Sequence, residues 1–137
     1  MGTTLSKTIL MMLLALVSNS AVAGWVEIGA SGVFGGSTAY IDPATIHKNG
    51  NNVKMWDLTD YKTAQENSFG VKPFLSDKLQ TEYDCKKEQL RTLVFSRFSG
   101  NMGHGEVVYS NSHPQMWHSV HSQGVGGARW EYACGKR

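Results

Sequence analysis

The chain has 137 residues and a formal net charge of +2 at pH 7, and 18% of its residues are charged. This length suits a single domain, and the nearly neutral charge excludes the basic surface on which nucleic-acid-binding proteins depend. The composition, which includes no low-complexity tract, also excludes an intrinsically disordered chain and predicts a globular one.

Residues 1–23 have the pattern of a secretory signal peptide. Lys7 supplies a short positive segment, residues 9–17 form an apolar run, and residues 21–23 (Ala-Val-Ala) form a small-residue cleavage site. The apolar run is about half of the roughly 20 residues that a membrane-spanning helix needs, which favours a signal peptide over a membrane anchor. Because no cysteine follows the cleavage site, we expect no lipid anchor. The predicted product is an exported single domain, residues 24–137, in the periplasm or at the cell surface.

Predicted strands begin directly after the signal peptide. Residues 25–29 are expected to open the sheet, and a second strand runs to Ile41, beyond which Pro43 breaks the hydrogen-bonded ladder. The dipeptide Asn49-Gly50 then predicts a tight hairpin turn.

The next predicted strand, within residues 51–61, has apolar side chains on both faces. Val53 and Met55 alternate with Trp56 and Leu58, so one pair should line a core and the other should lie on the outer face of the sheet. Such an outer face would be the natural surface for a second copy or another protein.

Residues 62–72 are polar and poorly periodic, and we interpret them as a flexible loop. In the stretch that follows, alternate residues share one face: Leu79, Thr81, Tyr83 and Cys85. This alternation predicts a half-buried strand with its cysteine on the core side. Three more strands are predicted within residues 90–98, 107–110 and 116–120, and short turns between strands favour a mostly antiparallel sheet.

The end of the chain fits two structures. Ala128, Trp130, Tyr132 and Cys134 alternate as they would in a strand. Trp130 and Cys134 are also four residues apart, as on one helix face, and Gly135 suits the position after a helix end. Periodicity alone leaves both readings open.

Cys85 and Cys134 are the only two cysteines, and in an exported protein such a pair predicts a disulfide. The bond would close a loop of about 50 residues and stabilise the fold by about 4 kcal/mol in the chain-entropy model.

The chain resembles the surface-adhesin protein E family of Gram-negative bacteria. The matching features are Trp25; Tyr40-Ile41-Asp42 with Ile46 and Lys48; Val53-Lys54-Met55-Trp56 with Asp60-Tyr61-Lys62; Tyr83-Asp84-Cys85; Arg91; Gly103 with Gly105; Trp117 with Val120; and Trp130 with Cys134. Together they span nearly all of the expected mature chain.

The resemblance implies an α+β, mostly β fold: an antiparallel sheet of about six strands, with a C-terminal helix on its concave side held by the disulfide. The ambiguous ending would then be the helix, with Trp130 and Cys134 on its buried stripe. The resemblance also implies a tendency to form homodimers. The family's best-known member is a lipoprotein adhesin that binds host extracellular-matrix and plasma proteins. The resemblance therefore implies that this chain is a non-enzymatic interaction protein that binds a host or envelope protein through a sheet face.

Other residues are candidates for metal-binding or catalytic sites. His113, His118 and His121 are weak candidates for a zinc or copper site, because their spacing matches no standard motif and exposed loop histidines explain them better. No nucleophile-elbow pattern occurs, and Asp42, Asp57, Asp60 and Asp84 are better explained by strand ends and ion pairs than by paired catalytic carboxylates. We expect no catalytic residue, no cofactor and no nucleic-acid partner.

The four tryptophans, Trp25, Trp56, Trp117 and Trp130, are candidates for an interface or for the core. Core packing is favoured for Trp117 and Trp130. The alternative function is a periplasmic small-ligand-binding or enzyme-inhibitor module, which predicts an enclosed pocket between sheet and helix lined by tryptophan and polar groups.

Overall fold

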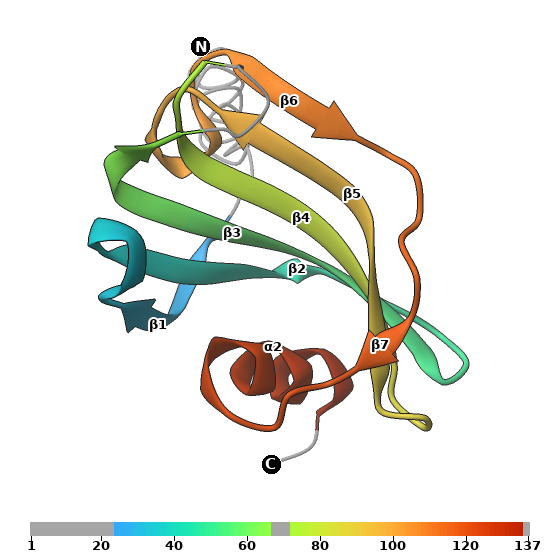
Figure 1. Cartoon of the computed structure of the whole chain (residues 1–137). Coiled ribbons are helices and arrows are strands. Elements are labelled where there is room, and N and C mark those ends of the chain that lie inside the picture. Colours follow the sequence, from blue (N-terminus) through green and yellow to red (C-terminus); the bar gives the residue numbers. More distant parts are fainter. Residues whose placement is uncertain (1–23, 67–71, 136–137) are drawn as a thin grey trace, which may run out of the picture.

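The computed structural model describes residues 24–66 and 72–135. The predicted signal peptide, residues 67–71 of the predicted loop, and the last two residues lie outside this part of the chain. The described residues form a strongly curved antiparallel sheet with one helix on its concave side (Figure 1).

Within the described residues, the sheet has six strands in chain order and a short seventh strand. The elements are β1 (Val26–Ser31), β2 (Ser37–Asn49), β3 (Asn52–Gln65), β4 (Phe74–Asp84), β5 (Gln89–Phe98), β6 (Val107–Asn111), β7 (His118–Ser119) and α2 (Gly124–Cys134), with 3₁₀ turns η1 (Val33–Gly35) and η2 (Asn101–Gly103). Each strand pairs with the next, and β7 pairs with β5 beyond the end of β6. The predicted antiparallel sheet with a C-terminal helix is therefore confirmed.

The β2–β3 hairpin turns where the sequence predicts, because Asn49 pairs with Asn52 and Gly50 has a φ of 62°. The prediction that the strand ends before Pro43 is wrong. Pairing lapses only between Asp42 and His47, and β2 continues to Asn49. The proline thus sits in a bulge, a position that a residue without an N–H group tolerates.

The side chain of Thr45 bridges this bulge. Its hydroxyl donates to the carbonyl oxygen of Asp42 at 2.7 Å and accepts the backbone N–H of Trp56 at 3.0 Å. A side chain therefore replaces the missing ladder hydrogen bonds.

The predicted loop begins too early, because β3 continues to Gln65. The backbone N–H of Lys62 donates to the carbonyl of Gly36 at 3.0 Å, and Gln65 pairs with Phe74 at the start of β4. Cross-strand hydrogen bonds order these polar residues, which periodicity does not reveal.

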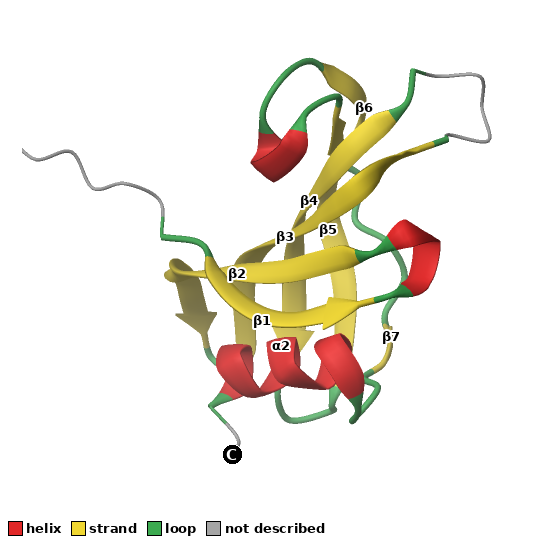
Figure 2. Ribbon diagram, turned by 90° about the vertical axis from the view of Figure 1, so that its left-hand side faces the viewer, coloured by secondary structure: helices red, strands yellow, loops and turns green. Residues whose placement is uncertain are grey.

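The hydrophobic core lies between α2 and the concave face of the sheet. Its buried members are Ile41, Val53, Met55, Tyr83, Trp130 and Ala133. Val53 and Met55 are therefore the pair that faces the helix, and Figure 2 shows α2 packed along the inside of the curve. The Tyr83 and Trp130 rings meet edge to face, with their centres 6.0 Å apart.

Glycine allows this helix to begin and end where it does. A Cβ atom on Gly127 would lie 2.5 Å from the carbonyl oxygen of Ser122, so no other residue fits against the segment that leads into the helix. At the other end Gly135 adopts the left-handed conformation with a φ of 69°, and its N–H donates to the backbone carbonyl oxygen of Glu131 at 2.8 Å.

On the outer face, the segment that contains η2 covers part of the sheet. Ser76 donates its hydroxyl to the carbonyl of Gly100 at 2.6 Å and accepts the N–H of Gly103 at 2.9 Å. Gly103 lies so close that a Cβ atom there would be 3.5 Å from Leu58 Cδ1. Leu58, which the sequence pairs with Trp56 on an open face, is 0% exposed for this reason.

Candidate functional site

The outer face carries a stack of two indole rings and a lysine. The ammonium nitrogen of Lys78 lies 5.8 Å from the centre of the Trp25 ring and 5.4 Å from that of Trp56. Both tryptophans are partly exposed. One ammonium group thus attracts the π faces of both rings at the surface.

A second stack lies beside the first. The Arg91 guanidinium lies 4.6 Å from the centre of the Trp117 ring, and its Nη2 is 2.8 Å from Glu82 Oε1. Glu82 is two residues from Gln80, the pairing partner of Trp56, so the two stacks are neighbours on one face. We call this surface the outer aromatic face: Trp25, Trp56, Lys78, Glu82, Arg91 and Trp117.

The fourth tryptophan lies on the other side of the sheet. Trp130 is 8% exposed and belongs to the core cluster, whereas Trp117, for which the sequence also favours the core, is partly exposed against Arg91. Periodicity does not reveal this position, because Arg91, the partner of Trp117, comes from a different segment of the chain, β5.

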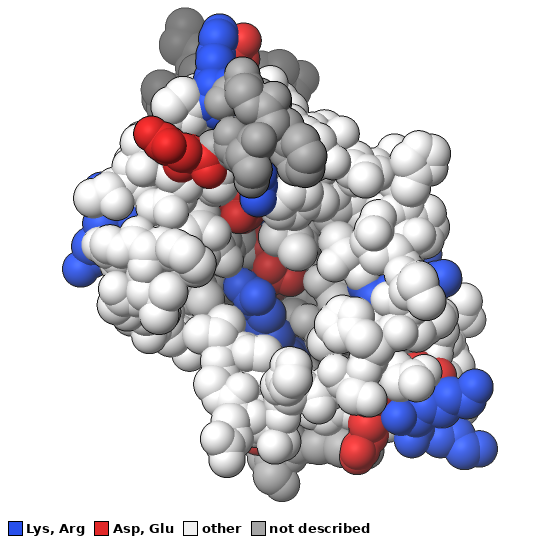
Figure 3. All heavy atoms as spheres, in the orientation of Figure 1, with Lys and Arg blue, Asp and Glu red and all other residues white. Residues whose placement is uncertain are grey.

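On the concave face, charged side chains lie at the floor of a hollow (Figure 3). Two adjoining cavities form this concave cleft, and both are lined by Leu79 and Thr92. The larger, of about 290 Å³, is also lined by Phe95, Arg97, Tyr109 and Asn111. The smaller, of about 180 Å³, is also lined by Asp57, Thr81, Leu90 and Arg129.

Two ion pairs lie at the centre of this face. Arg129 of α2 approaches Asp57 Oδ1 with its Nη2 at 3.4 Å and donates from the same nitrogen to Thr59 at 3.2 Å. Thr59 pairs with Asp77, whose Oδ1 lies 3.5 Å from Arg97 Nε. Neither long approach is a hydrogen bond, and both Oδ1 atoms are buried without one.

Burial controls the protonation of this cluster. Loss of hydration raises the pKa of Asp57 from 3.8 to about 6, although Arg129 and the hydrogen bond from Thr81 act in the opposite direction. Burial also raises the pKa of Asp77. It likewise raises the pKa of Tyr61, whose hydroxyl donates to Asp77 Oδ2 at 3.0 Å, to about 12.

The sequence does not predict this charge cluster. It indicates only Asp57, as a residue at a strand end or in an ion pair. A signal existed, since Asp57 continues the alternation of Val53 and Met55 and so belongs on the buried face. Asp77, Arg97 and Arg129 could not be assigned to it without strand register and helix position.

The cleft differs from the pocket that the alternative function predicts. None of the described residues that line it is a tryptophan; Tyr83, Phe95 and Tyr109 supply its aromatic surface instead. The cleft is also open to solvent at the surface seen in Figure 3 rather than enclosed.

The three candidate histidines have different surroundings. His113 lines the larger cavity and His118 the smaller, and His121 is exposed before α2. Within residues 24–66 and 72–135, no group of three or more His, Cys, Asp or Glu side chains could hold a metal ion.

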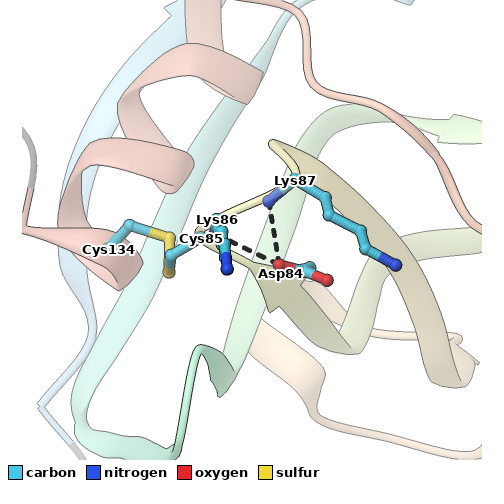
Figure 4. Close-up of a disulfide and its surroundings, with 5 residues drawn as sticks. All are labelled: Asp84, Cys85, Lys86, Lys87 and Cys134. Carbon is cyan, nitrogen blue, oxygen red and sulfur yellow. Dashed lines mark hydrogen bonds between the residues drawn. A yellow bond between two sulfur atoms is a disulfide. The ribbon is translucent and has the colours of Figure 1, made fainter.

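A disulfide between Cys85 and Cys134 joins the end of β4 to the end of α2 (Figure 4), as the sequence predicts. The Cα atoms are 5.6 Å apart. Beside it Asp84 Oδ1 accepts the N–H groups of Lys86 and Lys87, at 3.1 and 2.9 Å, and so closes the β4–β5 turn. The bond fixes the helix over the concave face.

Comparison with known proteins finds a matching family and solved structures with the same fold. The family model described as surface-adhesin protein E matches residues 25–135. A crystal structure of protein E from non-typeable Haemophilus influenzae shares the fold at 11% identity, with a TM-score of 0.59 over 85% of this chain and 79% of that one. A selenomethionine form of Haemophilus influenzae protein E has a TM-score of 0.61 at 11% identity, over 85% of this chain and 90% of that one. No curated protein matches the chain by sequence.

No helix within the described residues is long and apolar enough to cross a membrane.

Proposed function

Because the chain belongs to the surface-adhesin protein E family, we propose that it is an exported, non-enzymatic protein that binds a protein partner through its outer aromatic face. One observation carries the proposal. Trp25, Trp56 and Trp117 lie partly exposed on one face of the sheet, each stacked against a lysine or an arginine.

The composition of this face suits protein recognition. Tryptophan and arginine are the residues most enriched where binding energy concentrates in protein interfaces. The stacking on Lys78 and Arg91 orders these side chains before a partner arrives, which lowers the entropy that binding costs. The partner we propose is a host or envelope protein, or a second copy of this chain.

The rest of the molecule supports export rather than catalysis. A disulfide suits an oxidising compartment such as the periplasm or the cell surface. Each carboxylate of the cleft approaches an arginine and accepts a hydrogen bond from a hydroxyl group, Asp77 from Tyr61 and Asp57 from Thr81. Burial raises the pKa of Tyr61, which is the opposite of what an activated nucleophile needs. We therefore propose a signal peptide at residues 1–23 and a single protein E-like domain at residues 24–137.

The outer face is tested by replacing Trp56 with alanine. We expect the purified protein to bind at least one member of a panel of immobilised extracellular-matrix and plasma proteins. The Trp56→Ala variant should bind it about tenfold or more weakly, because truncation of an interface tryptophan costs that much or more. Surface plasmon resonance measures the dissociation constants of both proteins.

The matched control is Tyr132→Ala, which truncates a 41% exposed aromatic residue on α2, away from the outer face. It should bind as the unchanged protein does. Equal weakening by the two variants, or weakening by Tyr132→Ala alone, would exclude the outer aromatic face as the binding surface.

A small-ligand-binding role is a second candidate function. The described lining of the concave cleft lacks the tryptophans that this role predicts, but the size and the mixed walls of the cleft favour it. The larger cavity is close to the lower end of the size range of small-molecule sites and combines apolar with polar walls. This role is compatible with the first, since the two surfaces lie on opposite faces of the sheet.

A further inference from the structure

The concave cleft contains a guanidinium group that two aromatic rings hold in place, and its buried Nε has no hydrogen-bond acceptor. Arg97 lies between two rings, with its guanidinium carbon 4.3 Å from the centre of Phe74 and 4.9 Å from that of Phe95. Among the described residues its nearest charged partner is Asp77, whose Oδ1 lies 3.5 Å from Nε, and Nε is buried without a hydrogen bond. Because Nε is buried while the side chain is 26% exposed, the two terminal nitrogens of the guanidinium are the ones that can donate to a ligand.

The charge that this part of the cleft presents to solvent is positive. The side chain of Arg97 is 26% exposed, whereas that of Asp77 behind it is 9% exposed. None of the described residues that line the larger cavity is acidic. An anion that enters the cavity thus meets the guanidinium before it meets a carboxylate.

The remaining walls suit an organic ligand rather than an inorganic ion. Leu79, Phe95 and Tyr109 form an apolar surface beside Arg97. Asn111 supplies an amide at the edge. A planar guanidinium next to apolar side chains matches a carboxylate carried on a hydrocarbon body.

Arg129, in the smaller cavity, is less available to a ligand. Its Nε is buried without a hydrogen bond, as that of Arg97 is, but its Nη2 already donates to Thr59 and approaches Asp57, and its side chain is only 19% exposed. Arg97 is accordingly the anchor, and the smaller cavity, with Leu90 and Tyr83 among its walls, offers room for the far end of a longer hydrocarbon chain.

We propose that the concave cleft binds a small organic carboxylate, whose oxygens accept hydrogen bonds from Arg97 and whose apolar body lies on Leu79, Phe95 and Tyr109. The carboxylate has two sources, a free acid or the C-terminus of a peptide with an apolar last residue. Both present the same group to Arg97, and the site is independent of the outer aromatic face.

Nuclear magnetic resonance titration tests the site on the purified protein, with octanoate and 3-phenylpropionate as probes and octanamide as the neutral analogue. The acids should shift the amide signals of Leu79, Thr92 and Asn111, and octanamide should bind about tenfold or more weakly, because it lacks the charge that Arg97 recognises. An absence of shifts with either acid at about 10 mM, or equal binding of octanamide, would overturn the proposal.

Two variants separate the binding role from a structural one. Arg97→Gln should weaken octanoate binding about tenfold or more, whereas Lys54→Gln, which removes one positive charge from the opposite face, should leave it unchanged. Tyr109→Ala removes a wall that is 36% exposed and tolerates truncation, and it should also weaken binding. Unchanged affinity in both Arg97→Gln and Tyr109→Ala would place the acid elsewhere and refute the site.

A further titration with a peptide identifies the source of the carboxylate. Acetyl-Ala-Leu with a free C-terminus is compared with the same peptide as its C-terminal amide. Tighter binding of the free peptide than of octanoate supports a peptide C-terminus, and the reverse order supports a free acid. Equal binding of the peptide and its amide, together with equal binding of octanoate and octanamide, would contradict both sources.

Discussion

The Cys85→Ser variant should lose about 4 kcal/mol of unfolding free energy, because the disulfide closes a long loop in the unfolded chain. The two cysteines are 49 residues apart, and their bond joins the end of β4 to the end of α2. For a domain of this size the loss corresponds to a fall in melting temperature of about 20 °C. Circular dichroism during heating and urea titration measures both quantities.

The controls for this prediction use the same bond. Cys134→Ser and the double variant should melt at the same temperature as Cys85→Ser, and a reducing agent should bring the unchanged protein to that value. The outer aromatic face should still bind its partner at low temperature, since it lies on the opposite side of the sheet from α2. Unchanged melting in all of these proteins would mean that the bond does not stabilise the fold.

The Asp57→Asn variant should become more stable than the unchanged protein as the pH rises. Asp57 has a pKa of about 6 in the folded protein and 3.8 without burial, so the folded state binds its proton more tightly. Its favourable contribution is complete below about pH 4 and is lost as the pH rises through about 6. Asparagine resembles the protonated acid at every pH. The stability difference between variant and unchanged protein should therefore grow by up to about 3 kcal/mol between pH 4 and pH 8.

Thr81→Val is the matched variant for this effect. The Thr81 hydroxyl donates to Asp57 Oδ2 at 3.2 Å and lowers the pKa of that carboxyl group, so its removal should move the loss of stability to higher pH. Arg129 of α2 and Asp77 of β4 face the same carboxyl group, and both remain in either variant. Denaturant unfolding at a series of pH values gives the result. A stability difference between Asp57→Asn and the unchanged protein that does not vary with pH would contradict the account.

Much of the sheet can be predicted from the sequence, because period-two alternation depends on local order. Val53 and Met55 are assigned correctly to one face by alternation alone, and Asn49-Gly50 identifies its turn. Burial is harder to predict where a segment distant in the sequence covers a side chain. Leu58 alternates as an outer-face residue, yet hydrogen bonds from Ser76 to the segment around η2 bring that segment over it.

The end of the chain shows the same limit more sharply. The spacing of Trp130 and Cys134 fits a helix and a strand equally well, and the choice depends on what the side chains meet across the sheet. The charge cluster could not be predicted from the sequence either. Asp57, Asp77 and Arg97 lie on three different strands, so only the register of the sheet brings them together.

The most direct test of the proposed function is site-specific photo-crosslinking on intact cells with the partner panel present. A photoreactive residue at Gln80, which pairs with Trp56 on the outer face, should give a defined adduct with the partner, and the adduct should disappear when Trp56→Ala is added. The same group at Tyr132, which is exposed on α2, should give none. An adduct from Tyr132 but not from Gln80, or one from Gln80 that survives Trp56→Ala, would contradict binding through the outer aromatic face.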